Sequence, residues 1–204
     1  SERVGLTDAD GRILARDLAA PLPLPPFTNS AVDGFAVAGA DLPRDQEQIF
    51  PVAGRVQAGS SGEVAKPGHA VRIFTGAPMP DGTDTVFMQE DVLIEASGKV
   101  VLPAGLKTGA NVRPAGEDIP RGAVALKTGQ RLRPQDVALA AAFGLTELDV
   151  TGRIRVAVFS TGDELASPGT ERGAAQLFDS NRFMLSALLK RLGCKVSDLG
   201  ILRD

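Results

Sequence analysis

The stretch IRVAVFSTGDE, residues 154–164, decides the fold class of the C-terminal part of the chain. Its apolar, β-branched first half predicts a buried strand, and its second half predicts a polar loop at the carboxyl end of that strand. Residues 181–192 then predict a helix that begins after a cap at Asp179 or Ser180. A strand over residues 195–201 completes a parallel βαβ unit with the usual right-handed crossover.

Toward the N-terminus the chain changes character. Short β-type runs separated by Gly, Pro and Asp turns fill residues 27–121 and predict a helix-free small barrel or sandwich. Four prolines within residues 21–26 predict an extended crossing into this region. A helix is predicted over residues 134–143, because Pro134 suits the first helical position and Gly144 suits the stop.

The predicted fold class is therefore multi-domain and mixed, with elongated β-rich domains followed by the truncated start of an α/β domain. We assign residues 1–21 with 122–152 to subdomain I, residues 22–121 to the β-rich subdomain II, and residues 153–204 to the α/β subdomain III. One helix cannot cover both faces of a sheet, so we expect exposed apolar surface on subdomain III. We interpret the chain as the N-terminal piece of a larger protein.

Composition excludes several classes of protein. The chain has 204 residues, of which 43% are hydrophobic, and its net charge of -3 is too small for a disordered chain. With no excess of cations and no Trp or Tyr, we expect no nucleic-acid partner. No apolar run approaches the roughly 18 residues of a membrane span. A single cysteine suits a reducing compartment, so we predict a cytoplasmic protein.

The familiar catalytic motifs are missing from the sequence. It contains no phosphate-binding P-loop and no dinucleotide-binding glycine motif. One histidine and one cysteine exclude a zinc site of nitrogen and sulfur ligands and disfavour hydrolase triads. Any metal should therefore be a hard cation such as Mg²⁺, bound by carboxylate and phosphate oxygens.

Four loops carry more polar groups than a turn requires. They cover residues 25–35, 74–80, 113–119 and 160–164. Each alone reads as ordinary turn chemistry. In the loop over residues 74–80, a hydroxyl and a glycine follow a strand, so we expect free backbone N–H groups that point at an anion. Taken together, the carboxylates and the Thr75 hydroxyl suit a Mg²⁺-assisted reaction at a phosphate.

Five ordered motifs carry a resemblance to a known family. They are PPFTNSAVDGFAV at residues 25–37, RIFTGAPMP at 72–80, GEDI at 116–119, FSTGDEL at 159–165 and DSNR at 179–182. In this order and spacing they strongly resemble the molybdopterin molybdenumtransferase family, which includes MoeA and the E domain of gephyrin. The resemblance runs along essentially the whole chain.

The resemblance implies an enzyme of molybdenum cofactor biosynthesis. Such an enzyme takes adenylylated molybdopterin (molybdopterin-AMP) and molybdate as substrates, hydrolyses the adenylate with Mg²⁺ and inserts the metal. The residues that match the family motifs are expected to act as follows: Asp33, Thr75, Asp118 and Glu164 in catalysis, Asn29, Ser30, Gly76, Arg113, Glu117, Ser160, Thr161, Gly162, Asp163 and Asn181 in substrate binding, and Glu164 and Asp204 as Mg²⁺ ligands.

The resemblance also implies a homodimer, in which the β-rich domain of one subunit faces the α/β domain of the other. Other molybdenum cofactor biosynthesis proteins are expected as further partners. Family members are about twice as long as this chain, so we expect activity from the full-length parent and an inactive fragment. Two alternatives stay open: a non-catalytic scaffold of the gephyrin type, and a paralogue that handles tungstate.

Overall fold

The computed structural model describes residues 1–60 and 64–202, and the chain divides into two compact units. Unit 1 consists of Ser1–Leu18 and Leu126–Asp204, and unit 2 consists of Ala19–Ala125. Each unit buries its own hydrophobic clusters. The division into three subdomains stays a prediction.

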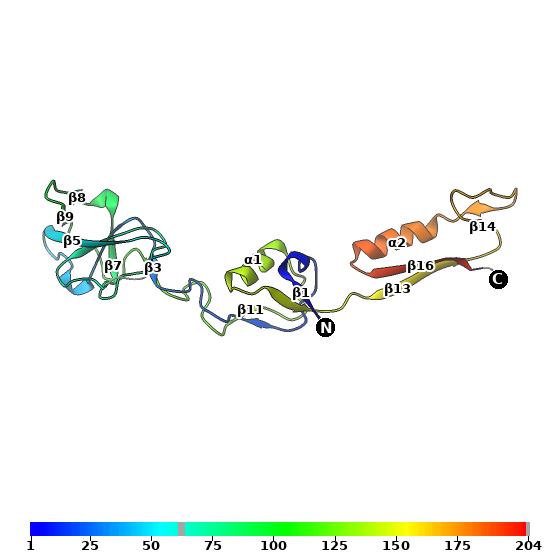
Figure 1. The fold of residues 1–204 in the computed structure, drawn as a ribbon, viewed down its shortest axis with the longest axis horizontal. Helices are drawn as coiled ribbons and strands as arrows, with labels where there is room; N and C mark the ends of the chain where they lie inside the picture. Colours follow the sequence, from blue (N-terminus) through cyan, green and yellow to red (C-terminus); the bar gives the residue numbers. More distant parts are fainter. Residues whose placement is uncertain (61–63, 203–204) are drawn as a thin grey trace. The chain divides into compact units, whose positions relative to one another are not determined.

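Unit 2 is built around a six-stranded sheet that curls on itself (Figure 1). Its strands are β4 (Gly34–Val37), β5 (Gln48–Val56), β6 (Ala70–Ile73), β7 (Thr85–Met88), β8 (Leu93–Ile94) and β9 (Lys99–Leu102), in the order β7-β4-β6-β5-β9-β8. All neighbours are antiparallel except β5 and β6. The first half of β5 pairs with β9 and its second half with β6, across a register shift between Val52 and Arg55.

Strand β4, which lies between β7 and β6, is buried on both faces. Phe35 and Val37 pack into one hydrophobic cluster, and Ala36, on the opposite face, packs into another. Gly34 begins the strand because a Cβ at this position would overlap the backbone carbonyl of Phe87 on β7. Strand β4, which begins at this glycine and pairs with β7, therefore holds the end of the 25–35 loop against the sheet.

Two short ribbons complete unit 2 and its connection to the rest of the chain. β3 (Asn29–Ser30) pairs with β10 (Val112–Arg113), and β2 (Leu18–Ala19) pairs with β11 (Val124–Leu126). The proline-rich segment forms bends at residues 21–22 and 25–26, so the predicted continuous extended crossing is not observed. The peptide bond between Leu24 and Pro25 is cis, and Leu24 forms an isolated bridge with Ile119. Within the described residues of 27–121, the only helical turns are of the 3-10 type.

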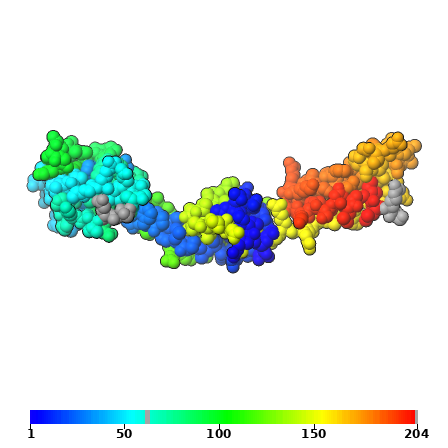
Figure 2. Space-filling model, in the orientation of Figure 1, coloured from blue at the N-terminus to red at the C-terminus, as the bar shows by residue number. Residues whose placement is uncertain are grey.

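The N-terminal segment of unit 1 packs with residues far along the chain. β1 (Glu2–Gly5) pairs antiparallel with β12 (Glu147–Val150), seen as blue beside yellow-green atoms in Figure 2. Helix α1 (Pro134–Ala142) begins at the predicted proline, and Gly144 follows its end with a φ of +74°. At its start the Arg133 N–H donates to the Asp136 carboxylate at 2.9 Å, which corresponds to one half of a capping box.

The remainder of unit 1 is the predicted βαβ unit. Strand β13 (Arg155–Thr161), helix α2 (Asn181–Arg191) and strand β16 (Lys195–Leu202) follow in order, and the two strands are parallel. Between β13 and α2 lie the short parallel strands β14 (Leu165–Ala166) and β15 (Leu177–Phe178). The expected apolar exposure is confirmed, since Phe159 and Leu199 are each about half exposed.

The β-rich character predicted for the chain is confirmed by these sheets. The larger α/β domain predicted around the βαβ unit stays a prediction. Among the described residues, no helix has the length and apolar character that crossing a membrane requires.

Candidate functional site

Three of the four polar loops meet at the short strand β3. Asn29 pairs with Arg113 in the β3–β10 ribbon, which brings the 113–119 loop to this strand. On the other side, the Gly76 N–H donates to the Ser30 carbonyl at 2.9 Å, and the Ser30 N–H donates to the Ala77 carbonyl at 3.0 Å. Strand β3 therefore joins loops that are separated by up to about 80 positions in the sequence. We call these three loops the β3 site.

Asp33 and Thr75 form the central contact of the β3 site. The Oδ1 atom of Asp33 accepts a hydrogen bond from the Thr75 backbone N–H at 2.8 Å and another from the Thr75 hydroxyl at 2.7 Å. The backbone and hydroxyl hydrogen bonds from Thr75 lower the pKa of Asp33 below its ordinary value. The carboxylate is therefore held in its ionised form, and the hydroxyl is oriented by it.

The expectation of free backbone N–H groups in the 74–80 loop is wrong. The N–H of Thr75 is bound to Asp33, that of Gly76 to Ser30, and that of Ala77 to the Phe74 carbonyl at 2.9 Å. These donors are satisfied within the protein and cannot form an anion nest. Gly76 is needed for its φ of +76°, since nothing lies within 4 Å of the place where a Cβ would stand.

Arg113 gathers the two carboxylates of the third loop. Its Nε donates to Glu117 at 2.7 Å, and its Nη2 donates to both carboxylate oxygens of Asp118 at 2.8 and 2.7 Å. The hydrogen bonds to Glu117 and then to Asp118 raise the pKa of Arg113. One cation and two carboxylates leave this cluster with a net negative charge.

Asn29 and Ser30 are buried within the β3 site. The Asn29 side-chain amide donates to the Phe27 carbonyl at 3.0 Å, and the Ser30 hydroxyl donates to the Val32 carbonyl at 2.6 Å. These hydrogen bonds shape the 25–35 loop from inside. The substrate contacts expected of both residues stay predictions.

The fourth loop, residues 160–164, lies in unit 1 at the carboxyl end of β13. Ser160 and Thr161 are the last two residues of that strand, and Gly162 follows with a φ of +132°. A Cβ on Gly162 would overlap the carboxylate of Glu164, so the glycine lets that side chain fold back over the loop. The carboxylate of Glu164 and the side chain of Asp163 are both exposed.

A buried ion cluster next to this loop is the feature that sequence reasoning missed. The Asp179 carboxylate accepts hydrogen bonds from the Arg182 backbone N–H at 3.3 Å and from its Nε at 2.7 Å, and Arg182 also binds Asp198. Hydrogen bonding from Arg182, aided by the Ser160 hydroxyl, lowers the pKa of Asp179 although burial opposes this shift. The DSNR motif at residues 179–182 was a signal in the sequence for this cluster, but Asp198, the partner on β16, lies in no motif.

Of the two predicted caps of helix α2, the one at Asp179 is confirmed. Ser180 occupies the N-cap position but makes no side-chain capping bond, and Asp179 instead reaches the N–H of Arg182. Asn181 is the exposed first residue of the helix. Its predicted substrate contact stays a prediction.

No cluster of three or more metal-ligating side chains occurs in the part of the chain that the structure describes. Asp204, one of the two Mg²⁺ ligands expected from the resemblance, lies outside the described residues. Glu164 is the other expected ligand, and its exposed carboxylate belongs to the donor class that Mg²⁺ prefers.

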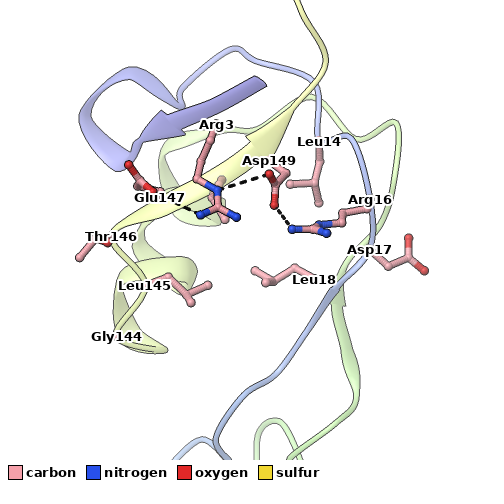
Figure 3. A pocket seen from close by; sticks show the side chains of 11 residues that line it. Arg3, Leu14, Arg16, Asp17, Leu18, Gly144, Leu145, Thr146, Glu147 and Asp149 are labelled. Atoms are coloured by element: carbon pink, nitrogen blue, oxygen red, sulfur yellow. Dashed lines mark hydrogen bonds and ion pairs between the residues drawn. The ribbon is translucent and has the colours of Figure 1, made fainter. Parts of the chain in front are cut away.

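A hollow of about 390 Å³ in unit 1 is separate from all of these loops (Figure 3). Asp149 lies between Arg3, at 3.6 Å, and Arg16, and Arg3 also lies 3.9 Å from Glu147. These charged groups neutralise one another, and apolar side chains such as Leu145 line the rest. None of the site residues predicted from the sequence lines this hollow.

Comparison with known proteins gives consistent matches. Residues 1–144 match the family described as MoeA N-terminal region (domain I and II). A molybdopterin molybdenumtransferase of Haemophilus influenzae is 40% identical over 205 residues, which is 100% of this chain and 50% of the relative. Molybdopterin molybdenumtransferase 2 of Mycobacterium tuberculosis is 41% identical over 201 residues, covering 95% of this chain and 48% of the relative.

A solved structure gives the same result. The crystal structure of a molybdopterin biosynthesis MoeA protein from Pyrococcus horikosii matches with a TM-score of 0.92 and 33% identity, covering 100% of this chain and 53% of that chain. The chain spans about half the length of the curated relatives it matches. Because the family match extends over residues 1–144, well beyond half of the sequence, the chain belongs to the MoeA family through its N-terminal region, domains I and II.

Proposed function

We propose that a full-length form of this protein, carrying this chain together with the remaining half of its relatives' length, is a molybdopterin molybdenumtransferase. Its two substrates would be adenylylated molybdopterin, whose adenylate it hydrolyses, and molybdate, which it inserts. The observation that carries the proposal is the β3 site, where Asp33 accepts both hydrogen bonds that Thr75 offers.

The chemistry of the Asp33–Thr75 pair suits the orientation of a nucleophile. When an ionised carboxylate accepts the hydrogen bond of the Thr75 hydroxyl, the lone pairs of the hydroxyl oxygen stay free to accept a hydrogen bond from water. Because the pKa of Asp33 is lowered, its carboxylate is a weak base near neutral pH. We therefore assign Asp33 and Thr75 to orienting the attacking water and the adenylate, rather than to removing a proton.

The charge of the β3 site bears on the need for a cation. Asp33 is ionised, and Arg113 is outnumbered by Glu117 and Asp118, so the site is net negative. A phosphate group would be repelled unless a hard cation compensated. When bound, Mg²⁺ would supply this compensation by neutralising phosphate charge. Glu164 fits it as a ligand by donor chemistry, and Asp204 is proposed as the second ligand.

Asp118 is proposed to orient the adenylate from the third loop. Its carboxylate is exposed, and both of its oxygens accept from one nitrogen of Arg113, which fixes its orientation. In this proposal the homodimer places Ser160–Glu164 of the partner opposite the β3 site, and the protein is cytoplasmic.

The test is turnover by the full-length form. We expect Asp33→Asn to lower the release of AMP from adenylylated molybdopterin by about 100-fold or more. The reason is that the neutral carboxamide lacks the negative charge with which the carboxylate accepts both Thr75 hydrogen bonds. Asp118→Ala should lower the release of AMP as well. Asp17→Asn serves as the control, since this carboxylate lies outside the β3 site and accepts from the Thr128 N–H at 2.7 Å.

Unchanged turnover in Asp33→Asn would refute the role of the β3 site. A full-length form that binds adenylylated molybdopterin but releases no AMP would favour the scaffold alternative. Titration calorimetry with the substrate separates binding from turnover.

A further inference from the structure

The guanidinium of Arg72, on β6, donates one hydrogen bond to the segment that carries Asp33 and one to a residue that itself binds Asp33. Its Nη1 donates to the carbonyl of Gly34 at 3.3 Å, and its Nη2 donates to the side-chain oxygen of Gln89. The Gln89 backbone N–H in turn donates to the carbonyl of Asp33 at 3.0 Å. Arg72 thus binds Gly34, the residue after Asp33, directly, and it is linked to Asp33 itself through Gln89.

The same guanidinium contacts the segment that carries Thr75. Its Cζ lies 4.9 Å from the ring centroid of Phe74, which immediately precedes Thr75, and 4.9 Å from the ring centroid of Phe35. Phe35 is buried on β4, directly opposite Arg72 in the β4–β6 register. Cation–π contacts of this kind hold a guanidinium and a ring in a defined stack.

Arg55 provides a contrast within the same cluster. Its Cζ lies 4.6 Å from the centroid of the same Phe74 ring, so it shares the stacking contact. Among the hydrogen bonds of the described residues, none joins Arg55 to Gly34, Gln89 or Asp33. Arg72 alone of these two cations therefore links both partners of the Asp33–Thr75 pair.

The side chain of Arg72 is suited to this task and that of lysine is not. A guanidinium has five N–H donors in a rigid plane, so it binds two acceptors and stacks on rings at once. Among the described residues, no carboxylate forms an ion pair with Arg72. Its hydrogen-bonding capacity is therefore directed to Gly34 and Gln89.

We propose that Arg72 is a positioning residue that holds the Asp33 turn and the Thr75 segment at the separation where the Thr75 N–H and hydroxyl both reach the Asp33 carboxylate. This inference deepens the proposed function and rests on the roles given there to Asp33 and Thr75. Arg72 acts through these residues and need not touch the substrate.

The first test uses the 204-residue chain and the ionisation of Asp33, followed by carbon-13 NMR of its carboxyl group. Three neighbouring groups are relevant to the pKa of Asp33. The hydrogen bonds from Thr75 lower it, and the positive charge of Arg72 lowers it further. The third group is Glu90, whose carboxylate accepts a hydrogen bond from the Gln89 side chain at 3.0 Å. Arg72→Lys keeps the positive charge but lacks the planar set of N–H donors that binds Gly34 and Gln89. We therefore expect a raised Asp33 pKa, because the Thr75 hydrogen bonds loosen.

Two further variants make this test decisive. Arg55→Gln removes the other cation on Phe74 and should leave the pKa of Asp33 unchanged. Gln89→Met removes one arm of the Arg72 link and should raise the pKa of Asp33, and it serves where Arg72→Lys does not fold. An Asp33 pKa equal to that of the wild type in a folded Arg72→Lys chain, or in Gln89→Met, overturns the proposal.

The second test is turnover in the full-length form. We expect Arg72→Lys to lower kcat by about 10- to 100-fold with little change in KM, since small displacements of orienting groups have effects of this size. Arg55→Gln should retain wild-type kcat. If Asp33→Asn abolishes turnover but Arg72→Lys behaves like Arg55→Gln, the positioning role is refuted and the proposed function stands. If Asp33→Asn retains turnover, the role of the β3 site fails, whereas a wild-type full-length form that releases no AMP would refute the proposed function itself.

Discussion

Asp179 and Arg182 form a buried ion pair at the start of helix α2, with the Nε of Arg182 2.7 Å from Oδ2 of Asp179. The two side chains are only 3% and 7% exposed. The same guanidinium binds Asp198 on β16, so one residue ties the first turn of α2 to the neighbouring strand. In a βαβ unit whose helix leaves much of its apolar surface exposed, this cluster is a main tertiary contact.

Replacing Arg182 by methionine should therefore destabilise the βαβ unit. The Asp179 carboxylate would remain buried without its cation, which is a strongly unfavourable arrangement. Amide hydrogen exchange in α2 and β16 of the 204-residue chain should become faster. Arg191→Met, at the exposed end of the same helix, is the matched control, and equal exchange in both variants would contradict the prediction.

The same pair predicts how acid affects this unit. In the folded chain the pKa of Asp179 lies below its ordinary value of 3.8, so the unfolded state takes up the proton first as the pH falls. The stabilisation by Asp179 is complete above about pH 3.8 and is lost as the pH drops through the folded pKa. Exchange rates of α2 amides between pH 6 and pH 2, corrected for intrinsic exchange, measure this loss.

Asp179→Asn should lack this contribution, because a carboxamide does not titrate. Its α2 amides should be less protected near neutral pH and should lose less protection on acidification. A variant whose acid dependence matched that of the wild type would show that Asp179 is not responsible.

In unit 2, Phe50 lies on β5 with 1% exposure inside the larger hydrophobic cluster. Phe50→Ala should lower the free energy of unfolding by about 3–5 kcal/mol, from lost burial and the cavity left behind. Phe27→Ala, at a ring that is 45% exposed, should cost less than about 1 kcal/mol. Urea unfolding followed at unit 2 amides measures both, and similar losses would argue against this packing.

The proposed homodimer makes a quantitative prediction about mixed dimers of the full-length form. If a site takes Asp33 from one subunit and Glu164 from the other, a dimer of Asp33→Asn and Glu164→Gln subunits contains one intact site. Random pairing of the two inactive variants should then restore about a quarter of wild-type turnover. If both residues act within one subunit, mixing restores nothing, and that result would exclude the shared site.

Sequence reasoning succeeded for elements that depend on neighbouring residues. The proline at position 134 and the glycine at 144 defined helix α1 closely, and Thr85–Met88 is a strand as its branched and apolar residues predict. The short strands separated by Gly and Pro turns predicted a β-rich unit. The parallel pairing of β5 with β6 had no local signal, since it depends on a crossing between segments apart in sequence.

The candidate site shows the same division. The motifs around Asp33, Thr75 and Asp118 selected the residues, and Asp118 binds Arg113 only five positions away. The contact between Asp33 and Thr75, however, joins residues 42 positions apart. The free N–H groups expected in the 74–80 loop proved to be occupied because the acceptors, Asp33 and Ser30, come from another loop. No pattern in the sequence indicated that Arg72 would link both segments.

What the sequence determined by itself was therefore the turn and strand chemistry and the family to which its motifs point. These follow from backbone preferences and side-chain types that act over a few residues. The tertiary structure alone decided which donors meet which acceptors. The physical reason is that a hydrogen bond or ion pair forms only when packing of the whole unit brings its two partners within about 3 Å of each other.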